Sequence, residues 1–211
     1  MKRKKVIKII LVIVLVIVVL FLVNLIRKAV IINKFSEKLK EYQSITNFYA
    51  KYQIENGNTI ESWRKDNITI QKTTTSDNEI NMMYANPNEI WMIMDKKETG
   101  KLATKMKNET EHNWSNGVVL EDGTLYADNF WDALLVALGC RISTETVNGQ
   151  ECYKLYFQEE FQVFVNKENL LKIKEINVDN VKYLIQYEIN TLTDEDVALP
   201  SLDGYKIQAS N

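Results

Sequence analysis

The sequence predicts an α+β fold that is mainly antiparallel β and is preceded by an N-terminal transmembrane helix. Three observations support this prediction. Residues 9–26 form an apolar run without a charge. Short segments of alternating apolar and polar residues follow one another from residue 48 onward, separated by turn residues. Within this region, residues 126–138 change to a helical period. The alternating segments are typical of consecutive strands in a meander.

The apolar run has the length of a membrane-spanning helix. Its 18 residues extend about 27 Å as a helix, close to the hydrocarbon thickness of a bilayer. Asn24, near one end, is its one polar residue. We therefore expect residues 9–26 to form a transmembrane signal anchor, which makes the membrane a partner of this chain.

Basic residues flank the run unequally. Those that precede it, with no acidic residue among them, are Lys2, Arg3, Lys4, Lys5 and Lys8. Those that follow it closely are Arg27, Lys28 and Lys34. The positive-inside rule then makes residues 1–8 a short basic cytoplasmic tail. It predicts a single-pass protein of the cell membrane whose C-terminal domain is extracytoplasmic.

A cleaved signal peptide is the alternative interpretation of the run. Its apolar region would span only about 7–15 residues and would end at a small-x-small site. The run here is longer, and no Ala-x-Ala motif follows it. An uncleaved anchor is therefore favoured. No cysteine lies near the end of the run, which argues against a lipid-modified N-terminus.

The remaining chain divides into a short connection and one domain. We expect residues 27–35 to be a juxtamembrane linker and residues 36–211 to form one extracytoplasmic domain of ordinary size. Residues 1–34 hold eight of the 26 basic residues and no acidic one, which leaves 18 basic against 28 acidic residues beyond them. No nucleic-acid partner is expected, because phosphate binding needs a positive patch. The abundance of Asn, Lys and Ile is typical of an AT-rich bacterial genome.

The first half of the domain alternates strands with clear turns. Residues 34–44 are expected to be helical because Phe35, Leu39 and Tyr42 recur at helical spacing. Asn56-Gly57 predicts a tight hairpin, and Asn86-Pro87-Asn88 predicts a later turn. The strands expected around these turns are residues 48–54, 59–65, a segment from 68, and then 80–84, 90–94 and 101–107.

The second half contains the predicted internal helix. We expect it over residues 126–138, with Asp128 as its cap and Gly139 as its end. The polar residues 108–123 before it show no regular pattern. Asn148-Gly149 predicts another hairpin. The strands expected after the helix are residues 141–147, 152–158, 161–165, 170–178 and 181–192.

Three segments in this order resemble a known family. They are NGQECYKLYF (residues 148–157), FQVFVNKENLLKIKE (161–175) and DVALPSLDGYKI (196–207). Together with the helix, meander, helix and further strands, they resemble the lipoprotein-carrier superfamily of the LolA/LolB-like fold, over about residues 36–207. The resemblance implies a strongly curved half-barrel sheet with one or two covering helices. The space between sheet and helices would hold an acyl chain or another apolar ligand.

Eight residues would fill that space and are the candidate apolar ligand cavity: Ile68, Ile70, Ile80, Met82, Tyr84, Ile90, Met92 and Met94. Flexible methionines suit an adaptable apolar site. The alternative is that these residues simply pack against the helix over residues 126–138. The family's function and functional residues are not carried over. A soluble carrier has no permanent anchor, and the lipid-modified member needs an N-terminal cysteine.

The two cysteines and the single histidine do not indicate a catalytic or metal site. Cys140 and Cys152 could form a disulfide in an extracytoplasmic domain, or they could be free thiols. In a simple hairpin that turns at Asn148-Gly149, they would not face each other. His112 lies in a polar segment beside Glu111, which is typical of a solvated side chain. We therefore expect no catalytic site, no metal and no cofactor, and hence no enzyme.

The sequence favours a binding function at the cell envelope. We expect a membrane-anchored extracytoplasmic binding or sensing protein that holds an apolar ligand, a lipid or an acyl chain, or an envelope protein. The alternative is a structural subunit of an envelope secretion or conjugation complex. Such subunits often combine one anchor with a small α+β ectodomain.

Overall fold

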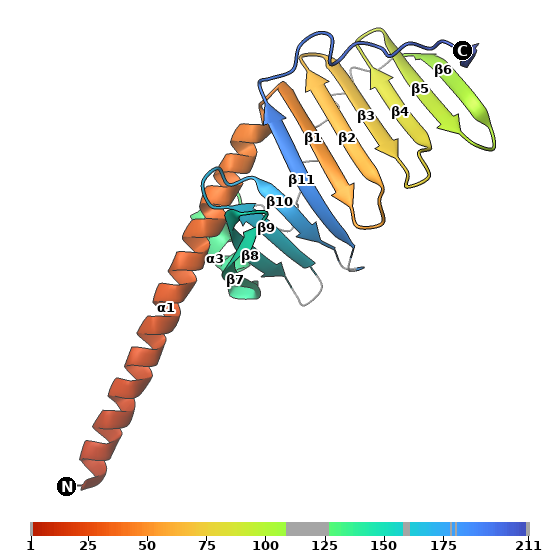
Figure 1. Ribbon diagram of the computed structural model, residues 1–211. Helices are drawn as coiled ribbons and strands as arrows, with labels where there is room; N and C mark the ends of the chain where they lie inside the picture. Colours follow the sequence, from red (N-terminus) through yellow and green to blue (C-terminus); the bar gives the residue numbers. More distant parts are fainter. Residues whose placement is uncertain (1, 109–126, 158–160, 178, 180, 210–211) are drawn as a thin grey trace.

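The computed structural model describes residues 2–108, 127–157, 161–177, 179 and 181–209. The protein is a mostly antiparallel, open, curved sheet of 12 strands with two helices in the described residues (Figure 1). The N-terminal helix extends far beyond the sheet, so its first half stands free of the domain. The predicted α+β, mainly antiparallel class is confirmed.

Helix α1 (Lys2–Gln43) is one continuous helix of 42 residues. It joins the apolar run, the segment expected as a linker and the helix expected over residues 34–44. The reason is local, since residues 27–35 contain neither glycine nor proline to interrupt the helix. The helix is long and apolar enough to cross a membrane, and its apolar window is not buried against the domain.

The second half of α1 packs on the sheet through one stripe. Ala29, Ile32, Phe35 and Leu39 recur every three to four residues and are at most 4% exposed. They form a core cluster with residues of β1 and β11 and with helix α3 (Phe130–Gly139). From residue 29 onward, α1 is therefore packed into the domain.

Two meanders build the sheet. The first contains β1 (Asn47–Ile54), β2 (Thr59–Lys65), β3 (Ile68–Thr74), β4 (Ile80–Ala85), β5 (Glu89–Lys96) and β6 (Gly100–Lys107). The second contains β7 (Cys140–Val147), β8 (Gln150–Phe157), β9 (Phe161–Asn166), β10 (Lys172–Ile176) and β11 (Lys182–Ile189). Antiparallel pairing of β1 with β11 joins them.

A twelfth strand closes the far edge of the sheet. β12 (Lys206–Ala209) pairs with β6 in parallel, whereas the other pairs are antiparallel. The sequence did not predict this strand. Residues 192–205 lead to it across the convex side of the sheet. The side chains of this segment that pack on the sheet are Leu192, Val197, Leu199, Leu202 and Tyr205. This C-terminal segment supplies the second core cluster.

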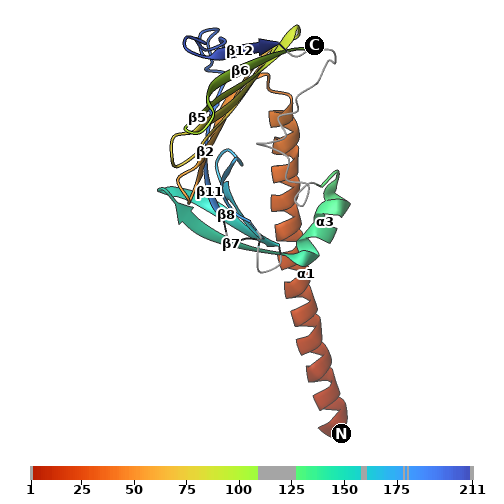
Figure 2. The ribbon, with the colours of Figure 1, turned by 90° about the vertical axis from the view of Figure 1, so that its right-hand side faces the viewer.

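The sheet curves around the helices. In Figure 2, α1 and α3 lie on the inner, concave side, and the C-terminal segment lies on the outer, convex side. α3 begins later than expected: Asn129, not Asp128, caps it, because the Asn129 side chain accepts hydrogen bonds from the amides of Trp131 and Asp132. The residues 109–126, which include His112, lie outside the described residues.

Candidate functional site

Strand pairing assigns the residues of the sheet to two faces. On the concave face, Ala50 lies opposite Ser62, Ser62 opposite Gln71, and this row continues to Met83 and Met92. Ala50 belongs to the cluster that packs on α1, so the whole row faces the helix side. On the convex face, Ile70 lies opposite Tyr84 and Tyr84 opposite Trp91. These three residues pack under the C-terminal segment.

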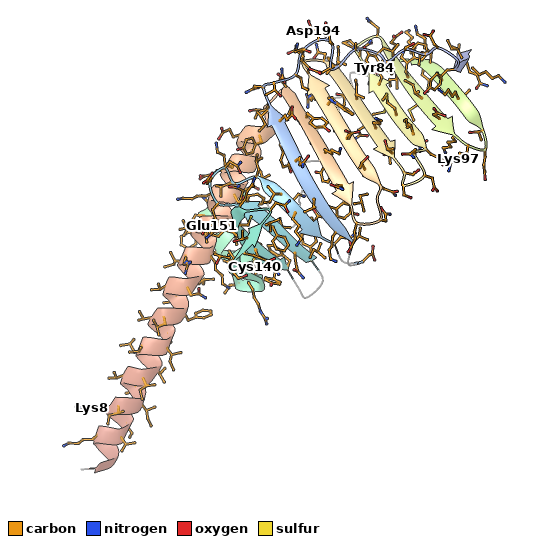
Figure 3. The ribbon with its side chains drawn as sticks, viewed as in Figure 1. Lys8, Tyr84, Lys97, Cys140, Glu151 and Asp194 are labelled. Carbon is orange, nitrogen blue, oxygen red and sulfur yellow. The ribbon has the colours of Figure 1, made fainter. Side chains whose placement is uncertain are left out.

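The eight predicted cavity residues do not share one face. Five of them lie on the convex face: Ile68, Ile70, Ile80, Met82 and Tyr84. The other three lie on the concave face: Ile90, Met92 and Met94. Of the convex five, Ile70 and Tyr84 are core residues beneath Leu192 and Val197, with Ile68 and Met82 packed beside them. Figure 3 labels Tyr84 at this far end of the sheet. The prediction of one common cavity is therefore wrong.

The cause is the connection between β4 and β5. Ala85 pairs with Ile90, so residues 86–89 separate the pair. A connection of even length places even-numbered residues of one strand beside odd-numbered residues of the next. The side-chain oxygen of Asn86 accepts hydrogen bonds from the amides of Asn88 and Glu89, which fixes this turn. Met82 consequently lies beside Ile93 instead of Met92.

The concave face of β4–β6 carries a surface that the sequence did not predict in full. We call it the methionine surface, and it comprises Met83, Ile90, Met92, Met94, Leu102 and Met106. It holds four of the six methionines of the chain. Met92 is 39% exposed, and the others are half-buried. Cross-strand pairs connect them: Met83 lies opposite Met92, and Met94 lies opposite Leu102.

The methionine surface continues into uncharged polar residues. Thr69, Gln71 and Thr73 of β3 extend it toward α1, and Asn81 and Thr104 add polar groups at two of its other paired positions. No charged side chain occupies these paired rows in β3–β6, up to Lys96 at the end of β5. The lysines and acids of these strands lie on the convex face instead, for example Lys105, which pairs with Glu89. Such a surface can contact an apolar molecule without removing a charge from water.

α3 does not cover this surface. It packs on α1 through Ala133 and Ala137, which are fully buried, and it meets the sheet at β7. The alternative expectation, that the candidate residues pack against the internal helix, is therefore wrong for the described part of the chain.

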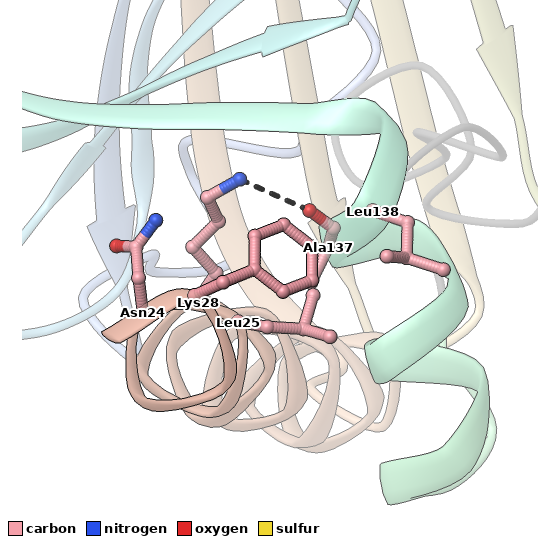
Figure 4. A pocket seen from close by; sticks show the side chains of 6 residues that line it. Asn24, Leu25, Lys28, Ala137 and Leu138 are labelled. Carbon is pink, nitrogen blue, oxygen red and sulfur yellow. Dashed lines mark hydrogen bonds between the residues drawn. The ribbon is translucent and has the colours of Figure 1, made fainter. Parts of the chain in front are cut away.

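The junction of α1 and α3 forms a second feature. The Nζ atom of Lys28 donates hydrogen bonds to the carbonyl oxygens of Ala137 at 3.2 Å and Cys140 at 2.6 Å. A positive charge at the last carbonyls of a helix is favourable because those carbonyls lack partners and carry the negative end of the helix dipole. Lys28 lies beside a hollow of about 30 Å³ that is also lined by Phe21, Leu25 and Leu138. Figure 4 shows Lys28, Leu25 and Leu138 around it. The hollow is large enough only for water-sized molecules.

Cys140 and Cys152 are free thiols. Cys140 lies opposite Phe157 and belongs to the cluster on α1, whereas Cys152 lies opposite Glu145 and packs with Phe164 on the other face. The disulfide considered from the sequence is therefore absent, because the hairpin register places the two sulfurs on opposite faces of the sheet. Burial raises the pKa of the Cys140 thiol to about 11 and also raises that of Cys152. Both thiols are consequently poor nucleophiles at neutral pH.

Among the described residues, no three His, Cys, Asp or Glu side chains gather as a metal site. No protein-family model matches the chain, and no curated protein matches it in sequence. The chain is similar to a crystal structure of an uncharacterized conserved protein from Thermus thermophilus, with a TM-score of 0.46 and 9% identity. That alignment covers 84% of this chain and 98% of the other. A likeness at this level carries no argument, and the LolA/LolB-like resemblance stays a prediction.

Proposed function

We propose that this protein is a membrane-anchored, extracytoplasmic binding protein of the bacterial cell envelope. In this proposal the sheet acts as a half-barrel, and its methionine surface holds an apolar ligand with an acyl chain. α1 fixes the domain to the membrane, with residues 1–8 in the cytoplasm and the domain outside. One observation carries the proposal: the half-buried concave face of β3–β6 carries no charge in its paired rows up to Lys96, at the end of β5, and is rich in methionine.

The distribution of charge supports the proposal that the concave face binds a ligand and does not simply contact water. The domain is rich in charged residues, and strands β3–β6 contain Lys72, Asp95, Lys101 and Lys105. All four lie on the convex face by pairing. A face that needed only water would tolerate such residues equally well. An apolar molecule would not, because a charge against it loses hydration without gaining a partner.

The chemistry of methionine supports an acyl chain. Its unbranched thioether side chain adapts to contacts of varying shape. Met83 lies opposite Met92, and Met94 lies two residues further along β5 on the same face, so the three side chains can adapt together around a flexible chain. A rigid aromatic ligand would be better matched by a rigid aromatic wall.

Photo-crosslinking tests the proposal. Full-length protein in lipid nanodiscs is irradiated with a C16 fatty acid that carries a diazirine, and the labelled peptides are identified by mass spectrometry. We expect labels in β4–β6. Met92→Glu should reduce them about tenfold, which corresponds to about 1.4 kcal/mol of binding free energy.

The chain offers a matched control for this substitution. Ile207 is 59% exposed and lies on the convex face, since β12 pairs it with Ala103 of the convex cluster. Ile207→Glu introduces the same charge at the same end of the sheet and should leave the labels of β4–β6 unchanged. Equal labelling in Met92→Glu and wild type would reject the methionine surface as the site.

A further inference from the structure

The outer face of α3 is apolar and exposed. Trp131, Leu135 and Leu138 follow one another at spacings of four and three residues, so they lie on one side of the helix. Their exposed fractions are 75%, 68% and 58%. The opposite side, with Ala133 and Ala137, is buried on α1. A helix that is packed on one side and apolar on the other requires a second apolar neighbour.

The position of α3 along α1 identifies that neighbour. The C-terminal end of α3 lies at Lys28, which bonds the carbonyls of Ala137 and Cys140. Leu138 lines the same hollow as Phe21 and Leu25 (Figure 4). Phe21 and Leu25 belong to the apolar run that ends at residue 26. The exposed face of α3 therefore continues the exposed apolar surface of α1.

The other end of α3 points away from the run. Lys40 Nζ donates to the carbonyl oxygen of Asp128, just before α3 begins, so α3 runs antiparallel to α1. From Leu138 to Trp131 the helix rises about 10 Å. The headgroup layer on each side of a bilayer is about 5–8 Å thick. With Leu138 at the level of the apolar run, Leu135 lies within the headgroup layer and Trp131 lies at its outer boundary with water, an interface where tryptophan is favoured.

Two exposed arginines lie near the level at which the apolar run ends. Arg27 follows the apolar run directly, and Arg141 follows the end of α3. Guanidinium groups at this depth complement lipid phosphates. The domain as a whole carries more acidic than basic residues. Arg27 and Arg141 therefore place positive charge at the level where a membrane surface would contact the protein.

We propose that α3 is a membrane-interface helix and that Trp131, Leu135 and Leu138 insert into the outer boundary of the same bilayer that α1 crosses. This proposal rests on the proposed membrane-spanning role of α1. Two contacts, one spanning and one interfacial, fix the tilt of the domain and thus the direction in which the concave face opens. A single helix would leave the domain free to rotate about its axis.

Fluorescence quenching by brominated lipids tests the proposal. The full chain is reconstituted into vesicles of phosphatidylcholine and phosphatidylglycerol, with and without bromine in the upper part of the acyl chains. Bromine quenches tryptophans in or next to the bilayer. We expect quenching in the wild-type protein and loss of most of it in Trp131→Phe, which keeps an apolar aromatic ring at the same place.

Flotation of the vesicles separates failure of this proposal from failure of the anchor. Protein that does not float with the vesicles contradicts the spanning role of α1 and overturns both proposals. Protein that floats but shows the same quenching in wild type and Trp131→Phe overturns the interfacial role of α3 alone.

A spin label gives an independent readout that does not depend on tryptophan. A nitroxide at Leu135→Cys should be more accessible to oxygen than to a water-soluble nickel chelate, as in a bilayer. A nitroxide at Ile207→Cys, which is equally apolar and exposed but far along the sheet, should show the reverse. Solvent-like accessibility at both positions overturns the proposal.

Discussion

The concave face of the sheet has two halves that differ in what covers them. In β1 and β11, Phe48, Ala50, Tyr52 and Ile185 are at most 6% exposed, because α1 packs over them. In β4–β6, the same face carries the methionine surface, whose most exposed member is 39% exposed. Both halves alternate with period two. Coverage by a helix, and not the strand pattern, therefore decides which half is core and which half is a candidate site.

The largest expected effect concerns stability in the covered half. Phe35→Ala removes a side chain that is 1% exposed between α1 and the sheet. Loss of that burial and the cavity left behind should lower the free energy of unfolding by about 3–5 kcal/mol. Urea unfolding of the full chain in nanodiscs measures it. Met92→Ala, a truncation in the half that neither described helix covers, should cost less than about 1 kcal/mol. Similar losses in both variants would refute the division of the concave face.

On the convex side of the sheet, the C-terminal segment covers β4–β6. Val197 is 1% exposed in the cluster with Ile70 and Trp91. Val197→Asp places a carboxylate in this cluster without a partner and should destabilise the segment by about 2–4 kcal/mol. Hydrogen exchange should then increase at the amides of residues 192–205. Ile207→Asp, at an exposed convex position, serves as the control and should leave that exchange unchanged.

A smaller effect is expected at the junction of α1 and α3. Lys28→Met keeps the aliphatic stem but removes the ammonium group that binds two carbonyls at the end of α3. The loss should be about 1–2 kcal/mol, the scale of hydrogen bonds to a charged group. Thermal unfolding followed by circular dichroism checks it. The exposed Lys34→Met should change the melting temperature little, and an equal shift in both variants would show that Lys28 does not cap α3.

The smallest expected effect is a pH dependence from Cys140. Its folded pKa of about 11 lies above the ordinary value of 9.0. The folded state therefore holds the proton more tightly, and the associated stability is present below about pH 9 and is lost as the pH rises toward 11. Because this pKa lies well above 8, the folded protein holds very little Cys140 thiolate near pH 8. Labelling of Cys140 by a thiol reagent should be correspondingly slow until urea unfolds the chain. Fast labelling of the folded protein would contradict this burial.

The strands could largely be predicted from the sequence, because turn residues mark their ends. Asn56-Gly57 and Asn148-Gly149 lie in hairpin turns, with both glycines at positive φ. The sequence predicted less reliably which face of the sheet each side chain lies on. The even-length connection at residues 86–89 places the even-numbered residues of β5 on the face opposite to the even-numbered residues of β4. The alternation within each strand carries no information about this change of face.

Tertiary contacts explain the other differences. β12 has only four residues, all with exposed side chains, so its pairing with β6 is what makes it a strand. α1 continues through the segment expected as a linker because no residue there interrupts a helix, and Ala29 and Ile32 of its packing stripe hold that segment on the domain. Of the methionine surface, Ile90, Met92 and Met94 were predicted. Met83, Leu102 and Met106 were missed because their membership follows from cross-strand register.

Methyl NMR tests the proposed site most directly. The full chain is labelled with ¹³C at its methionine methyl groups, reconstituted in nanodiscs and titrated with a C16 fatty acid, with assignments from single Met→Leu variants. Met83, Met92, Met94 and Met106 should shift together, whereas Met82, on the convex face beneath the C-terminal segment, should not. Shifts confined to Met82, or no shift at any of the five, would contradict a ligand site on the concave face.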